Sequence, residues 1–340
     1  MLDLAVVILA AGKGVRMNSK KQKILHAVGG APMVAHLFEA AVAISQHPPV
    51  LVIGEGGEQI QALFGQRGQY VAQTEKLGTG HATQMAMPLL AGRASQVAVC
   101  YADMPLLRAE TIRGLAERQA QTGAAVVLMS VRGTADSAFG RVVRDANGRV
   151  TEIVEAAQAR QRPNSADLLA ITEQNGGAYC FEGAWLWQTL PQLPPRTARD
   201  GHTEYYLTDV VEAAVRDGRL VEAILTDDPD ECLGAGTRAE LIAVDRAFRR
   251  RTVHYWLANG VTIIDPATTY IDPQVQIGQD TIIWPNSYLQ GETVVGEDCV
   301  IGPNTILRNA FIGHRCTVEQ VVVDGRTVAD NTRLSDSTRD

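Results

Sequence analysis

A glycine-rich turn near the start of the chain has the composition of a phosphate-binding loop. The segment Leu9 to Met17 (LAAGKGVRM) directly follows an apolar run, Leu4 to Leu9, that predicts a buried strand. Glycines let backbone N–H groups approach phosphate oxygens, and the cations of Lys13 and Arg16 could neutralise charge on a leaving pyrophosphate. The alternative is an ordinary strand-to-helix turn whose glycines serve only the backbone geometry. The turn alone leaves both interpretations open.

Two more charged residues could belong to the same site. Lys23 lies seven residues after Arg16, and Asp103 closely follows an apolar run, Val97 to Tyr101. A carboxylate at the end of a buried strand suits Mg²⁺, which binds one or two carboxylates together with substrate phosphates. The alternatives are a solvated lysine in a basic run and an aspartate that closes a turn before Pro105.

The first half of the chain alternates between strand-like and helix-like segments. Such alternation predicts βαβ units, and therefore a Rossmann-like α/β domain with a mostly parallel sheet covered on both faces. Ligands of such sheets bind outside the carboxyl ends of the strands, where the glycine turn, Gln73 to His81, and Tyr101 to Asp103 are all expected. The expected strands are Leu4–Leu9, Val50–Ile53, Val97–Tyr101 and Ala124–Val131, and the expected helices are Met33–Ile44, His81–Leu90 and Glu110–Gln119.

The C-terminal part of the chain has a six-residue period. A strict period of six aliphatic residues is neither helical nor a simple strand alternation, and it predicts a parallel β-helix of hexapeptide repeats. We expect about three coils of roughly eighteen residues each. The aliphatic positions are Ile271, Ile277, Ile283, Leu289, Val295, Ile301 and Leu307, and six of them are followed four places later by the smaller Val275, Thr281, Ser287, Thr293, Cys299 and Thr305.

A helix is expected between these two parts, over Ala239 to Leu257. It contains the run Arg249 to Arg251, which we interpret as a solvated helix face rather than a phosphate-binding group. The predicted organisation is a nucleotidyltransferase domain over 1–238, a linker helix over 239–260, a short β-helix over 261–334 and a frayed tail over 335–340.

Composition restricts the class of protein. The 340 residues carry a net charge of −7, and 46% of them are hydrophobic, which argues for a globular protein that does not bind nucleic acid through a basic face. The five cysteines are widely scattered, as is usual for buried thiols in a reducing compartment. An acidic residue, Asp3, lies near the N-terminus, where a signal peptide would have basic residues, and the sequence has no apolar run of membrane-spanning length. We expect a soluble cytoplasmic protein without a membrane partner.

Taken together, these motifs resemble one bacterial family, the N-acetylglucosamine-1-phosphate uridylyltransferases. They keep their order over the first two thirds of the chain, and the hexapeptide region continues the similarity. The segments that carry it are Leu9–Met17, Lys23–His26 (KILH), Gln73–Ala82 (QTEKLGTGHA), Tyr101–Pro105 (YADMP), Gly140–Val142 (GRV), Ile153–Glu155 (IVE) and Glu204–Asp209 (EYYLTD).

The resemblance implies a reaction and a role for individual residues. A sugar 1-phosphate oxygen would attack the α-phosphorus of UTP with Mg²⁺ present, and pyrophosphate would leave. The implied catalytic residues are Arg16, Lys23 and Asp103, with Asp103 also a metal ligand. Nucleotide binding is implied for Leu9, Ala10, Ala11, Gly12, Lys13, Gly14, Gln73, Gly78, Thr79 and Tyr101, and sugar binding for Gly140, Glu155, Asn175 and Tyr205. His81 is expected to order its loop rather than to act as a base.

The sequence departs from the family pattern at three positions. Gln22 replaces a proline, which should loosen that loop, and Gly176 replaces a threonine in the sugar loop. Gly236 stands where an asparagine usually gives the second metal contact. Water, Asp227 or Asp228 could substitute for that asparagine, or metal binding could be weaker.

The β-helix and the ligand specificity give further expectations. Longer family members carry an acetyltransferase site on this β-helix, and we expect no acetyl-CoA-dependent activity here. Similar coils associate as trimers, so a homotrimer is expected.

The principal hypothesis is a uridylyltransferase for N-acetylglucosamine 1-phosphate. The alternatives are another sugar-1-phosphate nucleotidyltransferase, for example a thymidylyltransferase, and a nucleotide-sugar-binding regulatory protein with weak turnover.

Overall fold

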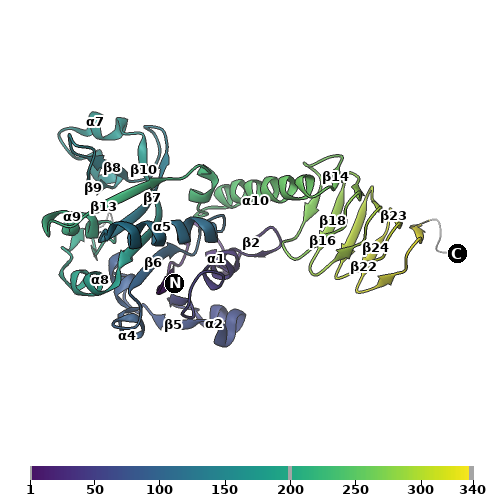
Figure 1. Cartoon of the computed structure of the whole chain (residues 1–340), viewed down its shortest axis with the longest axis horizontal. Coiled ribbons are helices and arrows are strands. Elements are labelled where there is room, and N and C mark those ends of the chain that lie inside the picture. Colours follow the sequence, from purple (N-terminus) through teal and green to yellow (C-terminus); the bar gives the residue numbers. More distant parts are fainter. Residues whose placement is uncertain (1, 198–200, 337–340) are drawn as a thin grey trace. The chain divides into compact units, whose positions relative to one another are not determined.

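The computed structural model describes residues 2–197 and 201–336 (Figure 1). The chain divides into two compact units, of which the first comprises Met1–Leu25 and Met33–Arg238. The second comprises His26–Pro32 and Ala239–Asp340. The short segment His26–Pro32 therefore groups with the C-terminal unit, although it lies within the predicted nucleotidyltransferase domain.

A central sheet in the first unit has the strand order β13-β7-β10-β6-β1-β4-β5. Its neighbouring strands run parallel, except that β10 is antiparallel to both β6 and β7. This arrangement confirms the predicted α/β fold with a mostly parallel sheet. The strands are β1 (Leu4–Ala10), β4 (Val50–Ile53), β5 (Gln69–Ala72), β6 (Gln96–Tyr101), β7 (Val126–Arg132), β10 (Glu173–Glu182) and β13 (Val221–Leu225), with β8 (Arg141–Arg144) and β9 (Val150–Val154) pairing beside β10.

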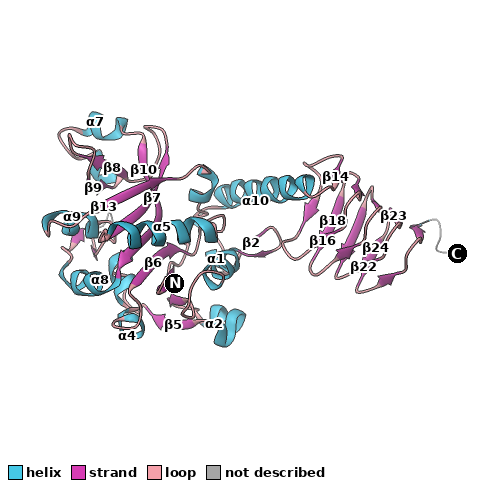
Figure 2. Ribbon diagram, in the orientation of Figure 1, coloured by secondary structure: helices cyan, strands magenta, loops and turns pink. Residues whose placement is uncertain are grey.

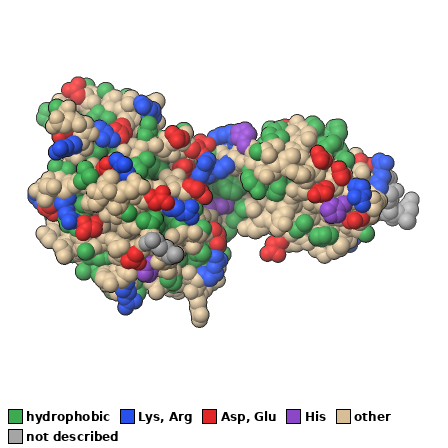
Figure 3. All heavy atoms as spheres, in the orientation of Figure 1, with side chains coloured by type: hydrophobic (Ala, Val, Ile, Leu, Met, Phe, Trp, Pro, Cys, Tyr) green, Lys and Arg blue, Asp and Glu red, His purple; other side chains and the backbone are tan. Residues whose placement is uncertain are grey.

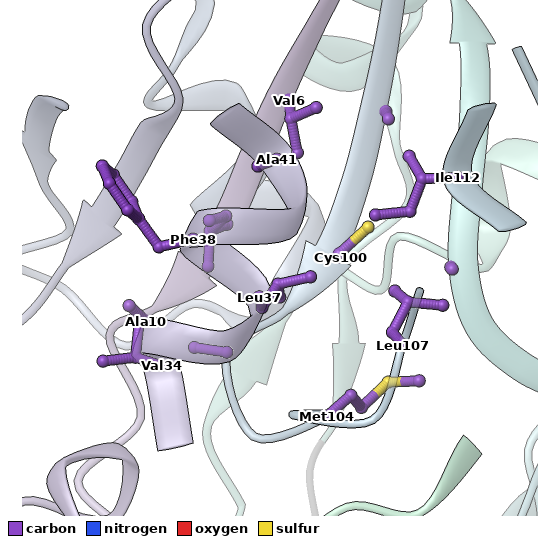
Figure 4. Packing of buried hydrophobic residues seen from close by; sticks show 14 of the residues in the cluster. Val6, Ala10, Val34, Leu37, Phe38, Ala41, Cys100, Met104, Leu107 and Ile112 are labelled. Atoms are coloured by element: carbon purple, nitrogen blue, oxygen red, sulfur yellow. The ribbon is translucent and has the colours of Figure 1, made fainter. Parts of the chain in front are cut away.

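Helices cover both faces of this sheet (Figure 2). Alternation along β1 places Leu4, Val6 and Ile8 in one hydrophobic cluster and Ala5 and Val7 in the other. In Figure 4 the first cluster joins Val6 of β1, side chains of α1 and Ile112 of α5. The helices are α1 (Met33–Val42), α2 (Glu58–Phe64), α3 (Gly78–Gln84), α4 (Met87–Leu90), α5 (Ala109–Thr122), α6 (Ala156–Ala159), α7 (Ser165–Ala170), α8 (Gly183–Thr189) and α9 (Asp209–Arg216).

One helix prediction in this unit is wrong. The expected helix His81–Leu90 is two helices, α3 and α4. Pro88 lies in the first turn of α4, where the missing N–H of a proline costs nothing but where it cannot continue a preceding helix. The expected strands and the other helices of this unit lie within a few residues of the elements observed.

The second unit contains the helix α10 (Arg238–Ala258) and a left-handed β-helix. All seven aliphatic residues of the six-residue period are buried in one cluster, and the smaller residues four places later are buried as well. The strands of the three sheets are β14 (Thr262–Ile263), β17 (Ile282–Ile283), β20 (Val300–Ile301), β23 (Thr317–Glu319) and β26 (Arg333–Ser335); β15 (Tyr270–Ile271), β18 (Ser287–Gln290), β21 (Thr305–Arg308) and β24 (Val322–Asp324); and β16 (Gln276–Ile277), β19 (Val294–Val295), β22 (Phe311–Ile312) and β25 (Thr327–Val328).

The predicted number of coils is wrong. Two sheets have four strands each and the third has five, so the described residues form four coils rather than three. The register pairs Ile283 with Ile301, Ile301 with Val318, and Val318 with Leu334, so each later coil loses one residue. This shortening breaks the six-residue period in the sequence while the coils continue. Ser335, which was expected in a frayed tail, is buried at the end of β26, and residues 337–340 lie outside the described part of the chain.

A short hairpin packs against α10 within the second unit. It consists of β2 (Ala27–Val28) and β3 (Ala31–Pro32), and Gly29 N donates a hydrogen bond of 2.8 Å to Asp245 Oδ1. Arg249 pairs with the same Asp245 at 2.7 Å, and its guanidinium lies 3.6 Å from the centre of the Tyr270 ring. The first arginine of the basic run is therefore engaged in packing and differs from the solvated residue that was expected.

On the face shown in Figure 3, acidic and basic side chains are interspersed over each unit. Among the residues that the structure describes, every helix is too short or too polar to cross a membrane. All five cysteines are buried and free, as expected.

Candidate active site

A cavity of about 350 Å³ opens at the carboxyl ends of β1 and β6 in the first unit. Residues Leu9 and Tyr101 pair in the parallel register of these strands, so the chain leaves both strands at the same edge. The cavity is lined by Leu9, Ala10, Ala11, Gly12, Lys13, Val15, Lys23, Ile24, Gln73, Lys76, Gly78, Thr79, Ala82, Tyr101, Asp103, Glu204 and Tyr206. The fold thus brings most of the predicted nucleotide-binding residues together with Lys23 and Asp103.

The two glycines of the opening turn have different roles. Gly14 has a φ of +65°, and a Cβ there would lie 2.3 Å from the Cβ of Lys23, so the fold itself requires a glycine. Gly12 lines the cavity, and a Cβ there would have no protein atom within 4 Å. No packing in the described structure explains Gly12. Close approach of a ligand to the backbone would explain it.

Two of the lysines that line the cavity, Lys13 and Lys23, form ion pairs with carboxylates. Lys23 Nζ lies 2.5 Å from Asp103 Oδ2, and both side chains are largely buried. Lys13 forms an ion pair with the exposed Glu55, and hydrogen bonding to Lys13 lowers the pKa of that carboxyl. The Gln22 side chain donates a hydrogen bond of 2.6 Å to the Glu55 carbonyl. At the position where a looser loop was expected, the glutamine thus adds a contact across the turn.

The predicted base-binding residues form a small network. Gln73 Nε2 donates a hydrogen bond of 3.0 Å to the carbonyl of Gly78 and lies 3.1 Å from His81 Nδ1. His81 therefore orients the Gln73 amide, which agrees with its predicted role in ordering the loop. The Oε1 atom of Gln73 takes no part in these contacts and is available as an acceptor on a lining residue.

The motif segments Gln73–Ala82 and Glu204–Asp209 pack against each other. Gly80 N donates to the carbonyl of Tyr205 at 2.7 Å, and Leu207 N donates to Thr79 Oγ1 at 3.0 Å. A Cβ at Gly78, whose φ is +88°, would lie 2.6 Å from the Tyr205 carbonyl oxygen. The segments around residues 78 and 205 are thus one structural element that forms a wall of the cavity.

Three of the predicted sugar-binding residues form a second group, which we call the sugar cluster: Gly140, Glu155 and Asn175. A Cβ at Gly140 would lie 3.5 Å from Glu155 Oε2 and 3.6 Å from Asn175 Cβ. Thr208 Oγ1 donates to Glu155 Oε1 at 3.2 Å. Burial raises the pKa of the Glu155 carboxyl, and the charge of Asp209 adds to this rise. The cluster does not line the cavity described above.

A buried arginine next to the sugar cluster was missed from the sequence. Arg141 is fully buried, and its guanidinium donates to three carbonyls of the preceding loop, those of Ala135 (2.8 Å), Ser137 (3.1 Å) and Phe139. Burial lowers its pKa. The loop leads directly to Gly140, so Arg141 holds the backbone of the sugar cluster in place. The available sequence signal was its place inside the motif segment Gly140–Val142.

Some predicted residues lie elsewhere, and others were missed. Arg16 is exposed on the short helix η1 (Val15–Met17) and does not line the cavity. Tyr205 does not line it either, and its backbone is hydrogen-bonded to Leu77 and Gly80. Tyr206, Glu204 and Lys76 do line the cavity. Each of the three falls inside a motif segment, so proximity in the sequence was the available signal.

A backbone segment that precedes α10 lies beside Asp103. Ala235 N donates to the Asp103 carbonyl at 3.2 Å, and a Cβ at Gly234 would lie 3.9 Å from Asp103 Oδ1. The segment that contains Gly236 is thus close to the predicted metal ligand. Asp227 and Asp228 line a different cavity, beside Arg108.

The donor set near Asp103 fits a magnesium ion that takes most of its ligands from substrate and water. Within residues 2–197 and 201–336, no three His, Cys, Asp or Glu side chains gather as a complete metal site. Mg²⁺ is usually bound in this incomplete way, by one or two carboxylates together with phosphate oxygens. The glycine at 234 leaves open space on one side of the carboxylate.

Comparison with known proteins decides the family. A family model described as the MobA-like NTP transferase domain matches residues 6–201, and a second, for bacterial transferase hexapeptide repeats, matches residues 274–309. "Bifunctional protein GlmU" from Exiguobacterium sibiricum is 39% identical over 93% of this chain and 69% of the relative. The protein of the same name from Pelotomaculum thermopropionicum is 42% identical over 97% of the chain and 70% of the relative. The chain belongs to the GlmU family. The resemblance inferred from the motifs is thereby confirmed, and the chain is a nucleotidyltransferase.

A solved structure supports the fold at lower similarity. CMP:2-keto-3-deoxy-manno-octonic acid synthetase, in a complex with CTP, is similar with a TM-score of 0.54 and 17% identity. The similarity covers 73% of this chain and 99% of the other. At this identity the likeness shows the fold alone.

Proposed function

We propose that this GlmU-family chain transfers a uridylyl group from UTP to N-acetylglucosamine 1-phosphate and releases pyrophosphate. The observation that carries the proposal is the pairing of two sites in one unit. A cavity with Lys13, Lys23 and Asp103 suits a triphosphate, and a buried cluster of a carboxylate and an amide suits an N-acetylated sugar.

The phosphate chemistry would depend mainly on position and charge. The turn around Gly12 would present backbone N–H groups to the triphosphate, and Lys13 would leave Glu55 to hold the departing pyrophosphate. The side chain of Lys23, held by Asp103, would neutralise charge on the reacting phosphates. Arg16, exposed beside the turn, would reach the leaving group only by moving toward it.

Mg²⁺ belongs to this proposal as the cofactor. Asp103 would hold it, with phosphate oxygens and water as the remaining ligands. When bound, the ion would offset negative charge on the phosphates and lower the barrier to attack.

The sugar cluster would select the acceptor. Glu155 would accept hydrogen bonds from sugar hydroxyls, and the Asn175 amide with the Gly140 backbone would contact the N-acetyl group. A buried carboxylate that gains donors from a ligand binds it more tightly than an exposed one, because no water competes for its oxygens.

A pyrophosphate-release assay tests the proposal. Purified protein is incubated with Mg²⁺, with UTP, CTP or dTTP, and with a panel of sugar 1-phosphates, and UTP with N-acetylglucosamine 1-phosphate should turn over fastest. Faster turnover with dTTP would instead indicate a thymidylyltransferase. UDP-sugar binding by calorimetry without any pyrophosphate release would favour the regulatory alternative.

Two properties of the β-helix unit complete the proposal. We infer association into a homotrimer, because its surface exposes large apolar side chains, Trp284, Phe311 and Val322 among them. Light scattering that shows a monomer at micromolar concentration would contradict it. We also expect no acetyl transfer from acetyl-CoA to glucosamine 1-phosphate, and release of a free thiol would overturn that expectation. The cytoplasm remains the proposed location.

A further inference from the structure

One backbone donor of the sugar cluster, the N–H of Gly140, has no acceptor in the protein. Gly140 is a buried residue that immediately precedes β8. Its carbonyl accepts a hydrogen bond of 2.8 Å from Asn175 N. Within the part of the chain that the structure describes, its N–H donates to no acceptor. Buried residues nearly always pair their N–H groups, so this donor indicates a place for an oxygen atom of a ligand or of water.

Arg141 holds the other end of the peptide group that carries this N–H. Its guanidinium donates to the carbonyl of Phe139, and that carbonyl and the Gly140 N–H belong to one peptide group. The peptide bond is planar and trans, so the N–H points away from the guanidinium. Asn175 N holds the next peptide group through the Gly140 carbonyl. Both peptide groups that flank the Gly140 Cα are thus fixed, and with them the direction of the free N–H.

The charge of Arg141 strengthens the same donor. Arg141 is fully buried, and its other two hydrogen bonds go to the carbonyls of Ala135 (2.8 Å) and Ser137 (3.1 Å), so none of the three acceptors is a carboxylate. A guanidinium stays protonated at neutral pH. A cation that is hydrogen-bonded to a carbonyl draws electron density from the peptide group, which makes the N–H at its other end a better donor.

The absence of a side chain at position 140 brings this donor close to the carboxylate of the sugar cluster. A Cβ there would lie 2.9 Å from Ile153 Cγ2 and 3.5 Å from Glu155 Oε2. The strand that leads to Glu155 therefore packs as close to the Gly140 backbone as a glycine allows. A sugar that bonds to Glu155 is large enough to reach the Gly140 N–H as well.

We propose that Arg141 is a positioning residue, which directs and strengthens the Gly140 N–H as the donor to the carbonyl oxygen of the N-acetyl group. This inference rests on the proposed function, and it makes Arg141 a determinant of sugar selectivity. Arg141 is fully buried and acts through the peptide group rather than by contact with the sugar. Glucose 1-phosphate, which has a hydroxyl in place of the acetamido group, presents no carbonyl oxygen to this donor.

Kinetics of Arg141→Lys test the proposal. Lysine keeps the charge, but its single nitrogen cannot hold three carbonyls as the planar guanidinium does. We expect the KM for N-acetylglucosamine 1-phosphate to rise by about five- to thirtyfold, the effect of weakening one buried hydrogen bond, while the KM for UTP stays within about twofold. The preference for this sugar over glucose 1-phosphate, measured as a ratio of kcat/KM values, should fall by a similar factor. Equal losses with both sugars would show a purely structural role and overturn the proposal.

The same substitution at another arginine of β8 is the matched control. Arg144 also donates to a carbonyl, that of Gly148 at 2.8 Å, and it forms an ion pair with Glu173. Arg144→Lys should leave both KM values and the sugar preference unchanged. A change of preference as large as that of Arg141→Lys would show that the effect is not specific to the peptide group at Gly140, and the proposal would be wrong.

A measurement on the unmodified chain does not depend on whether the variant folds. Labelling with ¹³C-carbonyl phenylalanine and ¹⁵N-glycine selects the amides of Phe–Gly pairs, and the sequence has two of these, Phe64–Gly65 and Phe139–Gly140. In NMR spectra, UDP-N-acetylglucosamine should move the Gly140 amide proton downfield, UDP-glucose should move it less, and the Gly65 signal should not move. Bound UDP-N-acetylglucosamine without a shift at Gly140, or an equal shift with UDP-glucose, would overturn the inference. A chain that binds neither compound and releases no pyrophosphate would instead refute the proposed function itself.

Discussion

The phosphate turn and the sugar cluster of this GlmU-family enzyme are built in opposite ways. The turn uses neighbouring residues of one segment and is open: the Lys13 side chain is 42% exposed, and a Cβ added at Gly12 would meet nothing within 4 Å apart from its chain neighbours. The sugar cluster gathers residues from three strand ends. Asn175 is buried, Glu155 is partly buried, and both side chains are already hydrogen-bonded to protein.

The difference reflects the ligands that the two regions are proposed to bind. A triphosphate brings its own charge and displaces water and Glu55, so the turn needs free donors more than it needs rigidity. A neutral sugar is recognised by the direction of its hydrogen bonds, so its partners must be held before it arrives. Substitutions in the turn, except at Gly14, which the fold requires, should therefore change activity with little effect on stability, whereas substitutions in the cluster should change both.

The largest effect is expected for Asp103→Asn on the nucleotide side. Loss of the carboxylate removes the proposed metal ligand and the partner of Lys23, and turnover should fall by about a thousandfold, while the melting temperature stays close to that of the wild type. Pyrophosphate release and thermal unfolding are measured together. Asp227→Asn is the control: the exposed carboxylate lies in the other cavity, and turnover should stay within about twofold. Normal activity of the Asp103 variant would remove this residue from the metal role.

Glu155→Gln should affect both binding and stability. Loss of the charge should raise the KM for the sugar phosphate by about ten- to a hundredfold, since hydrogen bonds to buried charged groups are the strong ones. The pKa of Glu155 is raised in the folded protein, mainly by burial. The wild type therefore loses stability as the pH rises through that pKa, and the glutamine variant does not.

The stability difference between the Glu155 variant and the wild type is thus predicted to grow with pH. Melting temperatures compared at about pH 4 and about pH 8 should favour the variant more at the higher pH. A difference that is the same at both pH values would show that folding does not raise the pKa of the Glu155 carboxyl. Burial of Glu155 would then have no pH-dependent effect on stability, and the proposed difference between the turn and the sugar cluster would lack this support.

Gly12→Ala should separate ligand binding from folding in the turn. The added methyl group meets no protein atom within 4 Å, so the melting temperature should not fall. The KM for UTP should rise by about tenfold or more, because the methyl group would keep the phosphates away from the backbone. Gly114→Ala, which also adds a methyl group in open space but in the middle of α5, should leave the KM unchanged and raise stability by about 0.5–1 kcal/mol. An unchanged KM for the Gly12 variant would mean that the turn does not contact the triphosphate.

The smallest effect is expected for Glu55→Gln. This exposed carboxylate only holds Lys13 when no nucleotide is bound, so its loss should lower the KM for UTP by no more than about twofold, and added salt should remove the difference. A rise in the KM would show that Glu55 supports the bound state of the turn instead of competing with it.

The sequence was most informative where chemistry and periodicity are local. The turn from Leu9 to Met17 and the polar segments after β5 and β6 could be placed at one sheet edge, because the carboxyl ends of parallel strands meet there. The β-helix followed from its six-residue period, yet the number of coils was underestimated, because single-residue deletions after Leu307 break the period without breaking the fold. The break between α3 and α4 was overlooked although Pro88 marks it.

Contacts between distant segments were not predictable from spacing. Arg141 donates hydrogen bonds to carbonyls of the loop that precedes it. No local sequence pattern predicts the path of that loop. The contact between Asp103 and the backbone of Gly234 and Ala235 joins segments that are far apart in the sequence. Tyr179, which accepts a hydrogen bond from Asn175, has the sequence context of an ordinary core residue of a strand.

The sequence by itself therefore determined the α/β and β-helix architecture, the family and most of the nucleotide cavity. These depend on repeated patterns and on residues that are close along the chain. Only the tertiary structure decided how the sugar cluster is held. A β-bulge at Gly176 and Gly177 brings Asn175 to Tyr179, and such a contact exists only after two strands have paired in a shifted register.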